Sequence, residues 1–274
     1  MKTAFVLSGG GFKGCFQAGV ISQLYKKGIT PDVVYGTSVG SINAAGCAYL
    51  GPDRLIKHWL GMKSKGEALF PHGAWWLLYW HRVFWSSGLY SPKPLKQYLE
   101  SIVGDTTLCD AVSCFVNLKP PGKIGYCSAR QSTKADYIDS VLASAAIPMF
   151  IEPTNYCVDG GVREQTPLKK AMDDGATSIY VVLCNPWVTD PLEDWKPSRL
   201  FPLIGVGFRA IDDLMCHEIF INDIQNNVQE CKRCGIDLHL YAPDRVWMST
   251  LEFSKDKIKS AIESGQCMKE VVLY

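Results

Sequence analysis

The sequence lacks a long hydrophobic run, an excess of charge of one sign and any internal repeat. No uninterrupted apolar stretch approaches the ~20 residues needed to span a bilayer, so a transmembrane helix is excluded. The 28 basic and 27 acidic residues give a formal net charge of +1, without the basic excess that nucleic-acid binding favours. Because no linker or low-complexity segment divides the chain either, we expect residues 1–274 to form a single domain with no nucleic-acid partner.

A second pair of cysteines at the C-x-x-C metal-ligand spacing is also lacking. The 11 cysteines are scattered and odd in number, and Met1 is not followed by a secretory signal. We therefore expect free thiols in a reducing, cytoplasmic compartment, with a peripheral position at a membrane as a further expectation. Cys231 and Cys234 form a single C-x-x-C, and one such pair does not close a tetrahedral zinc site, so we predict two free thiols and no metal.

What is present is an alternation of strand and helix patterns. Residues 3–7 form a short apolar run that ends in glycines, which is typical of a buried strand, and residues 13–27 place apolar side chains on one helical face. Residues 33–35 and 41–50 repeat the strand and the helix, so the order predicts a parallel, doubly wound α/β sheet with right-handed crossovers. Further helices are expected at 54–60, 94–103, 136–146, 203–231 and 255–263, a hairpin at 114–118 and 123–127, and strands at 178–184 and 236–241.

A G-x-S-x-G motif stands between the second predicted strand and its helix. A nucleophile elbow turns so sharply that the flanking positions tolerate almost no side chain, which explains Gly36 and Gly40. The turn presents Ser38 at the start of a helix, where the helix dipole favours the negative charge that develops during acyl transfer. We interpret Ser38 as a nucleophile; the alternative is a tight turn with an N-cap serine.

A glycine-rich run follows the first predicted strand. Consecutive glycines let backbone N–H groups converge on an anion, which in an acyl hydrolase is the oxyanion of the tetrahedral intermediate. Lys13 either adds charge to this loop or is a solvated lysine at the start of a helix. The run also matches G-x-G-x-x-G, but a dinucleotide site needs an acidic residue at the end of the second strand, where the chain has the serine motif. The predicted oxyanion hole consists of Gly9, Gly10, Gly11, Phe12, Lys13 and Gly14.

An aspartate stands between a short strand-like run and two glycines. Asp159 precedes Gly160 and Gly161, so it lies at a turn from which its carboxylate can face the end of another strand. A carboxylate hydrogen-bonded to Ser38 would accept its proton as a general base. On its own, the Asp-Gly-Gly run is typical of a simple turn.

Together, four segments resemble the patatin-like phospholipase family: residues 9–14, 36–40, 143–150 and 159–161, in this order. The resemblance covers residue 3 to about residue 184. It implies a three-layer α/β/α fold with a mainly parallel central sheet, lipid acyl hydrolase activity of the phospholipase A or lysophospholipase type, and no cofactor. It also implies a Ser38–Asp159 dyad without a catalytic histidine, an acyl-enzyme intermediate, and a structural role near the site for the helix that bears Ser144 and Pro148.

The sequence is also compatible with several alternatives. A Ser, Asp, His triad would use His217 or His239, which follow Asp159 in the chain. Acyl transfer would use the same dyad with an alcohol in place of water, and a non-catalytic lipid-binding module would use neither residue chemically. The aromatic residues of 75–85 recur every four positions, which favours either a lid or interfacial helix that transiently contacts a membrane surface, or a core helix.

Overall fold

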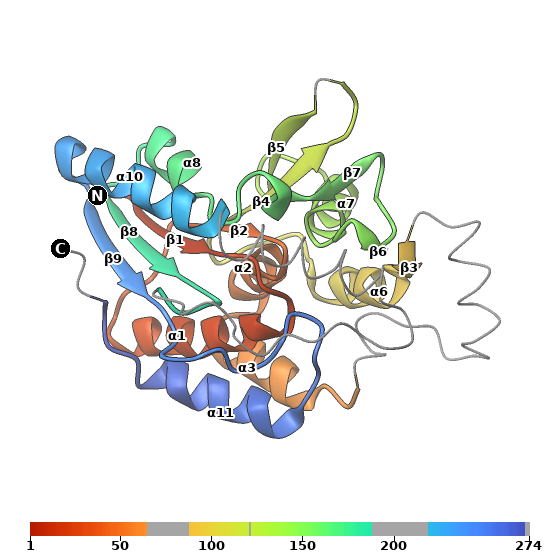
Figure 1. Cartoon of the computed structure of the whole chain (residues 1–274), viewed down its shortest axis with the longest axis horizontal. Coiled ribbons are helices and arrows are strands. Elements are labelled where there is room, and N and C mark those ends of the chain that lie inside the picture. Colours follow the sequence, from red (N-terminus) through yellow and green to blue (C-terminus); the bar gives the residue numbers. More distant parts are fainter. Residues whose placement is uncertain (65–87, 121, 188–218, 272–274) are drawn as a thin grey trace.

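The computed structural model describes residues 1–64, 88–120, 122–187 and 219–271. Within these ranges the chain forms a central sheet in the order β5-β4-β2-β1-β8-β9, with β7 paired to β4 (Figure 1). The pairs β4–β2, β2–β1, β1–β8 and β8–β9 are parallel, whereas β5 and β7 run antiparallel to β4. The strands are β1 (Thr3–Leu7), β2 (Val33–Thr37), β4 (Asp110–Asn117), β5 (Lys123–Ser128), β7 (Cys157–Asp159), β8 (Ser178–Val182) and β9 (Asp237–Tyr241).

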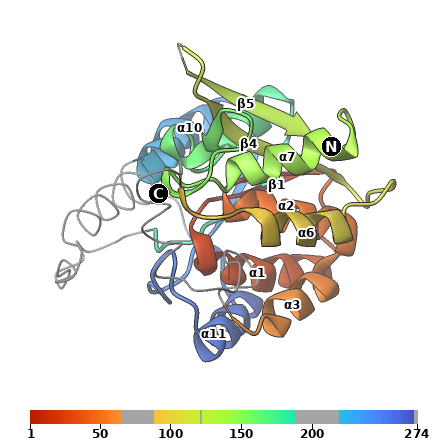
Figure 2. The same ribbon diagram turned by 90° about the vertical axis from the view of Figure 1, so that its right-hand side faces the viewer.

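Helices cover both faces of this sheet, because its buried strands are apolar on both sides. In β1, Phe5 and Leu7 pack into a core with α1, α2, α3, α6, α7 and α11, while Ala4 and Val6 pack against α8 and α10 on the other face (Figures 1 and 2). These helices are α1 (Cys15–Lys26), α2 (Val39–Leu50), α3 (Pro52–Gly61), α6 (Lys93–Ile102), α7 (Lys134–Ser144), α8 (Leu168–Asp173), α10 (Phe220–Cys234) and α11 (Lys255–Gln266).

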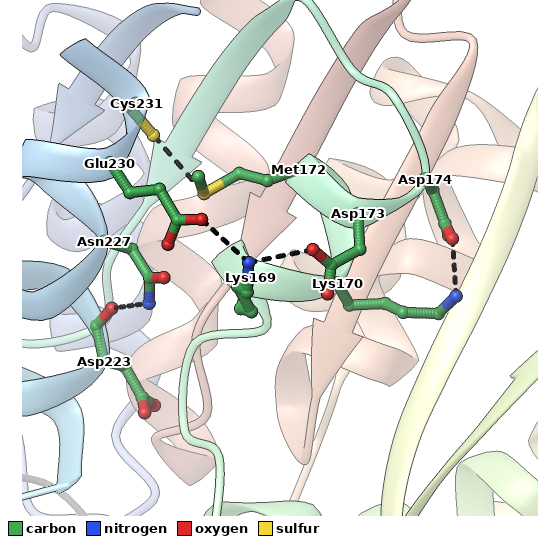
Figure 3. Close-up of polar contacts among 9 residues, drawn as sticks. All are labelled: Lys169, Lys170, Met172, Asp173, Asp174, Asp223, Asn227, Glu230 and Cys231. Atoms are coloured by element: carbon green, nitrogen blue, oxygen red, sulfur yellow. Dashed lines mark hydrogen bonds and ion pairs between the residues drawn. The ribbon is translucent and has the colours of Figure 1, made fainter. Parts of the chain in front are cut away.

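Polar contacts join the two helices of the second face (Figure 3). Lys169 of α8 contacts Glu230 of α10 at 3.0 Å, and it also contacts Asp173 at 2.9 Å. The thiol of Cys231 meets the sulfur of Met172 at 3.5 Å. Cys231 therefore contributes to packing between α8 and α10.

The predicted fold class is confirmed, and most predicted elements exist with small shifts of their ends. The helix expected at 13–27 begins instead with a 3-10 turn (Gly11–Gly14), because the glycine loop continues into the first turn. The small parallel pair β3 (Gly88–Tyr90) and β6 (Met149–Ile151) was not predicted, since three-residue strands leave little periodicity. Two expected segments, residues 75–85 and 203–218, lie outside the described residues. None of the described helices is long and apolar enough to cross a membrane.

Candidate active site

The carboxyl ends of β1 and β2 bring the glycine loop and Ser38 to the same edge of the sheet, because the two strands are parallel neighbours. Ser38 lies between the end of β2 and the first residue of α2, with φ 56° and ψ −125°. A non-glycine residue with positive φ is strained, and such strain is concentrated at functional sites. Ser38 is buried, with only 5% of the residue's surface exposed.

The glycines on either side of Ser38 are required by close backbone approach. A Cβ atom on Gly36 would lie 2.2 Å from the carbonyl group of Gly40. A Cβ atom on Gly40 would lie 2.3 Å from the carbonyl oxygen of Leu7, at the end of β1. Any side chain at either position would force the elbow away from the sheet edge.

Asp159 ends β7, opposite Phe115 of the antiparallel neighbour β4. Its side chain is fully buried, and Oδ1 accepts a hydrogen bond from the N–H of Gly161 at 2.8 Å. Burial raises the pKa of Asp159 to about 7, although the nearby Ser38 hydroxyl and the Gly161 N–H each lower this pKa. Oδ2 is buried and meets no hydrogen-bond partner among the described residues. The structure therefore brings Ser38 and Asp159 together, with one carboxylate oxygen available.

In the predicted glycine loop, some backbone N–H groups donate a hydrogen bond within the protein and others do not. The N–H of Gly9 donates to the carbonyl of Gln165 at 3.0 Å, and that of Lys13 donates to Gly10 at 3.3 Å. Within the described part of the chain, the N–H groups of Gly10 and Gly11 donate no hydrogen bond. They are therefore the members of the loop that remain able to bind an anion.

The rest of the loop is held by a segment that no motif marked. The N–H of Phe12 donates to the carbonyl of Thr250 at 3.0 Å, and the Phe12 ring meets the edge of the Phe253 ring at 5.7 Å. Gly11 has φ +58°, and a Cβ atom there would lie 2.0 Å from the Thr250 oxygen. Lys13 is only 4% exposed, so the interpretation of a solvated lysine is wrong.

A buried chain of amides connects this loop to α2 and α3. Gln17 Nε2 donates to the carbonyl of Ser8 at 2.9 Å, and its Oε1 accepts from Asn43 at 2.8 Å. Asn43 also donates to the carbonyl of Gly14 at 2.8 Å and accepts from the Trp59 indole at 3.0 Å. These bonds fix both ends of the glycine loop. The sequence does not predict these contacts. Gln17, Asn43 and Trp59 belong to no motif, and they meet only because the helices that bear them pack together.

An apolar cavity of about 420 Å³ opens at Ser38. It runs between the glycine loop, α2, α3 and α6, and the Thr250 segment also reaches it. Most of its lining is hydrocarbon, which suits a flexible apolar chain better than a polar ligand. Its lining includes Ile42, Leu55, Leu95, Ile147 and Leu251.

The described histidines do not contact the Ser38 hydroxyl. Both ring nitrogens of His239 are engaged, with Asp237 at 2.9 Å and Glu270 at 3.0 Å, and its ring stacks on Tyr180. His58 lines the cavity and packs edge-on against Tyr98, with ring centroids 5.1 Å apart. His72, His81 and His217 lie outside the described residues.

Comparisons with known proteins agree with this geometry. The family model described as patatin-like phospholipase matches residues 5–172. The chain is 27% identical over 255 residues to the "Uncharacterized protein YjjU" of Escherichia coli, covering 84% of this chain and 65% of that protein. It is 27% identical over 180 residues to a "cGAMP-activated phospholipase" of Vibrio cholerae, covering 56% of this chain and 50% of that protein. It is 29% identical over 302 residues to the "Uncharacterized protein YqhO" of Bacillus subtilis, covering 98% of this chain and 97% of that protein.

The chain therefore belongs to the patatin-like phospholipase family. It spans only 65% and 50% of the length of the first two relatives.

Proposed function

We propose that this protein hydrolyses a carboxylic ester of a phospholipid, lysophospholipid or neutral lipid through a Ser38–Asp159 dyad. The strongest support for the proposal is a strained, buried serine that lines an apolar cavity and lies beside a buried carboxylate with a pKa of about 7. A general base is most effective when its pKa lies near the working pH.

In the first half-reaction, Ser38 Oγ attacks the acyl carbonyl carbon while Asp159 accepts the hydroxyl proton. The N–H groups of Gly10 and Gly11 bind the oxyanion that forms. Collapse of the intermediate breaks the ester bond, and the leaving alcohol takes the proton from Asp159. An acyl group remains bound to Ser38.

In the second half-reaction, water attacks the acyl-enzyme and Asp159 accepts its proton. The second tetrahedral intermediate releases the fatty acid, and Ser38 recovers its proton from Asp159. The apolar cavity holds the acyl chain throughout, and this burial favours long chains by about 0.8 kcal/mol per methylene group.

The test is covalent labelling by a fluorophosphonate probe, measured by intact mass, together with hydrolysis of a panel of lipid esters. We expect one label on the wild type, no label on Ser38→Ala, and labelling slowed by about 10²- to 10⁴-fold in Asp159→Asn. Ser22→Ala is the control, because Ser22 is also buried but lies within α1.

Two outcomes would contradict the proposal. Undiminished labelling of Ser38→Ala would place the nucleophile elsewhere. A folded wild type that neither labels nor hydrolyses any ester, but binds lipid, would favour the non-catalytic binding module.

A further inference from the structure

The carboxyl end of α7 holds the backbone of both residues of the proposed dyad. Ser144 is the last residue of α7 and is fully buried, and its Oγ accepts the N–H of Ser38 at 2.8 Å. Two residues later, the carbonyl of Ala146 accepts the N–H of Asp159 at 3.0 Å. One short segment therefore contacts the nucleophile and the base without touching their reacting atoms.

The Ser38 N–H depends on this side chain. Ser38 lies beyond the end of β2 and before the first turn of α2, so neither the sheet nor the helix supplies an acceptor for it. A buried N–H without a partner is unfavourable, and here it would add to the strain of a positive φ. The Ser144 hydroxyl removes that cost only when Ser38 keeps its strained conformation.

The Ser144 oxygen is itself fixed on the strand that pairs with Asp159. It donates to the carbonyl of Cys114 in β4 at 2.5 Å and lies 2.7 Å from the Ser41 hydroxyl. The Ser41 hydroxyl donates its proton to the carbonyl of Gly36 at 2.7 Å, so the Ser144 oxygen accepts the Ser38 N–H and uses its own proton for the Cys114 carbonyl. Gly160 packs on the same Cys114 carbonyl, where an added Cβ would lie at 2.5 Å.

We propose that Ser144 is a positioning residue, which together with the Ala146 carbonyl sets the separation between Ser38 and Asp159. The proposal rests on the proposed function, because that separation matters only if the two residues act as nucleophile and base. It gives a specific role to Ser144, for which the family resemblance implies only a structural role near the site.

The test compares Ser144→Ala with Ser140→Ala. Ser140 is a matched control, since it is buried one turn earlier on α7 and its Oγ donates to the Tyr137 carbonyl within the same helix, at 2.7 Å. For Ser144→Ala we expect kcat to fall about 10- to 100-fold with KM nearly unchanged, the range that loss of one buried hydrogen bond predicts. We also expect faster amide hydrogen exchange at Ser38, measured by NMR. Ser140→Ala should match the wild type in both.

A second variant guards against a folding defect. Ser144→Cys fills the same space with a weaker acceptor, so we expect a smaller loss of kcat and an intermediate exchange rate. Wild-type kcat and wild-type Ser38 exchange in Ser144→Ala would overturn the inference, as would equal losses in Ser140→Ala. An inactive but folded wild type would refute the dyad, and the exchange rate of Ser38 would still decide whether Ser144 holds the elbow.

Discussion

Replacing Asp159, the proposed base, should stabilise the protein while it lowers activity, and the gain in stability should depend on pH. Burial raises the pKa of Asp159 from 3.8 to about 7, so the folded state disfavours the carboxylate. At a pH between 3.8 and about 7, Asp159 is ionised in the unfolded chain but still protonated in the folded chain. The free energy of unfolding therefore falls as pH rises through this range. From the two pKa values, the cost is about 2 kcal/mol at pH 5 and about 4 kcal/mol at pH 8.5.

Asp159→Asn removes this cost and keeps an oxygen for the Gly161 N–H. The buried amide of asparagine brings a penalty of its own, but that penalty does not titrate. The gain in the free energy of unfolding should therefore grow by about 2–3 kcal/mol between pH 5 and pH 8.5, whatever its absolute size. Urea unfolding at the two pH values measures it, with Asp105→Asn, an exposed carboxylate, as the control. A gain that is equal at both pH values would refute the assignment of a buried, titrating base.

The remaining predictions concern activity. Because the proposed mechanism requires an ionised Asp159, kcat/KM should rise with pH through about 7, as a pH–rate profile would show. Gly11→Ala should lower kcat by about 10²- to 10³-fold, since its Cβ would meet the Thr250 carbonyl at 2.0 Å; stopped assays on a soluble ester test this. Ile42→Trp should shorten the preferred acyl chain, with a loss of about fourfold in kcat/KM for each methylene group excluded, measured on esters of graded length. His58→Ala should keep kcat within a few-fold of the wild type, and a large loss would instead favour a histidine base.

The parts of the site that could be predicted from the sequence are those in which the backbone itself imposes the residue type. Gly36 and Gly40 can be recognised in the sequence, because a side chain at either position would clash with the main chain. This requirement produces a short local motif. Ser144 was noticed only within a resemblance, because a serine at the end of a helix has no distinctive local pattern. Thr250 was missed, since it acts through its carbonyl group, and any residue type supplies one.

Each single contact at the site contributes little to the free energy that holds Ser38 in its strained conformation, so several contacts must act together. A strained residue such as Ser38 costs of order 1–3 kcal/mol, whereas one neutral hydrogen bond returns only about 1 kcal/mol. The elbow therefore needs several restraints at once: the Ser144 hydroxyl on its N–H, the Ser41 N–H on its carbonyl at 2.9 Å, and close packing of Gly40 on β1. Because these restraints come from different elements, partial loosening of any one should impair the alignment of Ser38, the proposed nucleophile, before the fold as a whole is lost.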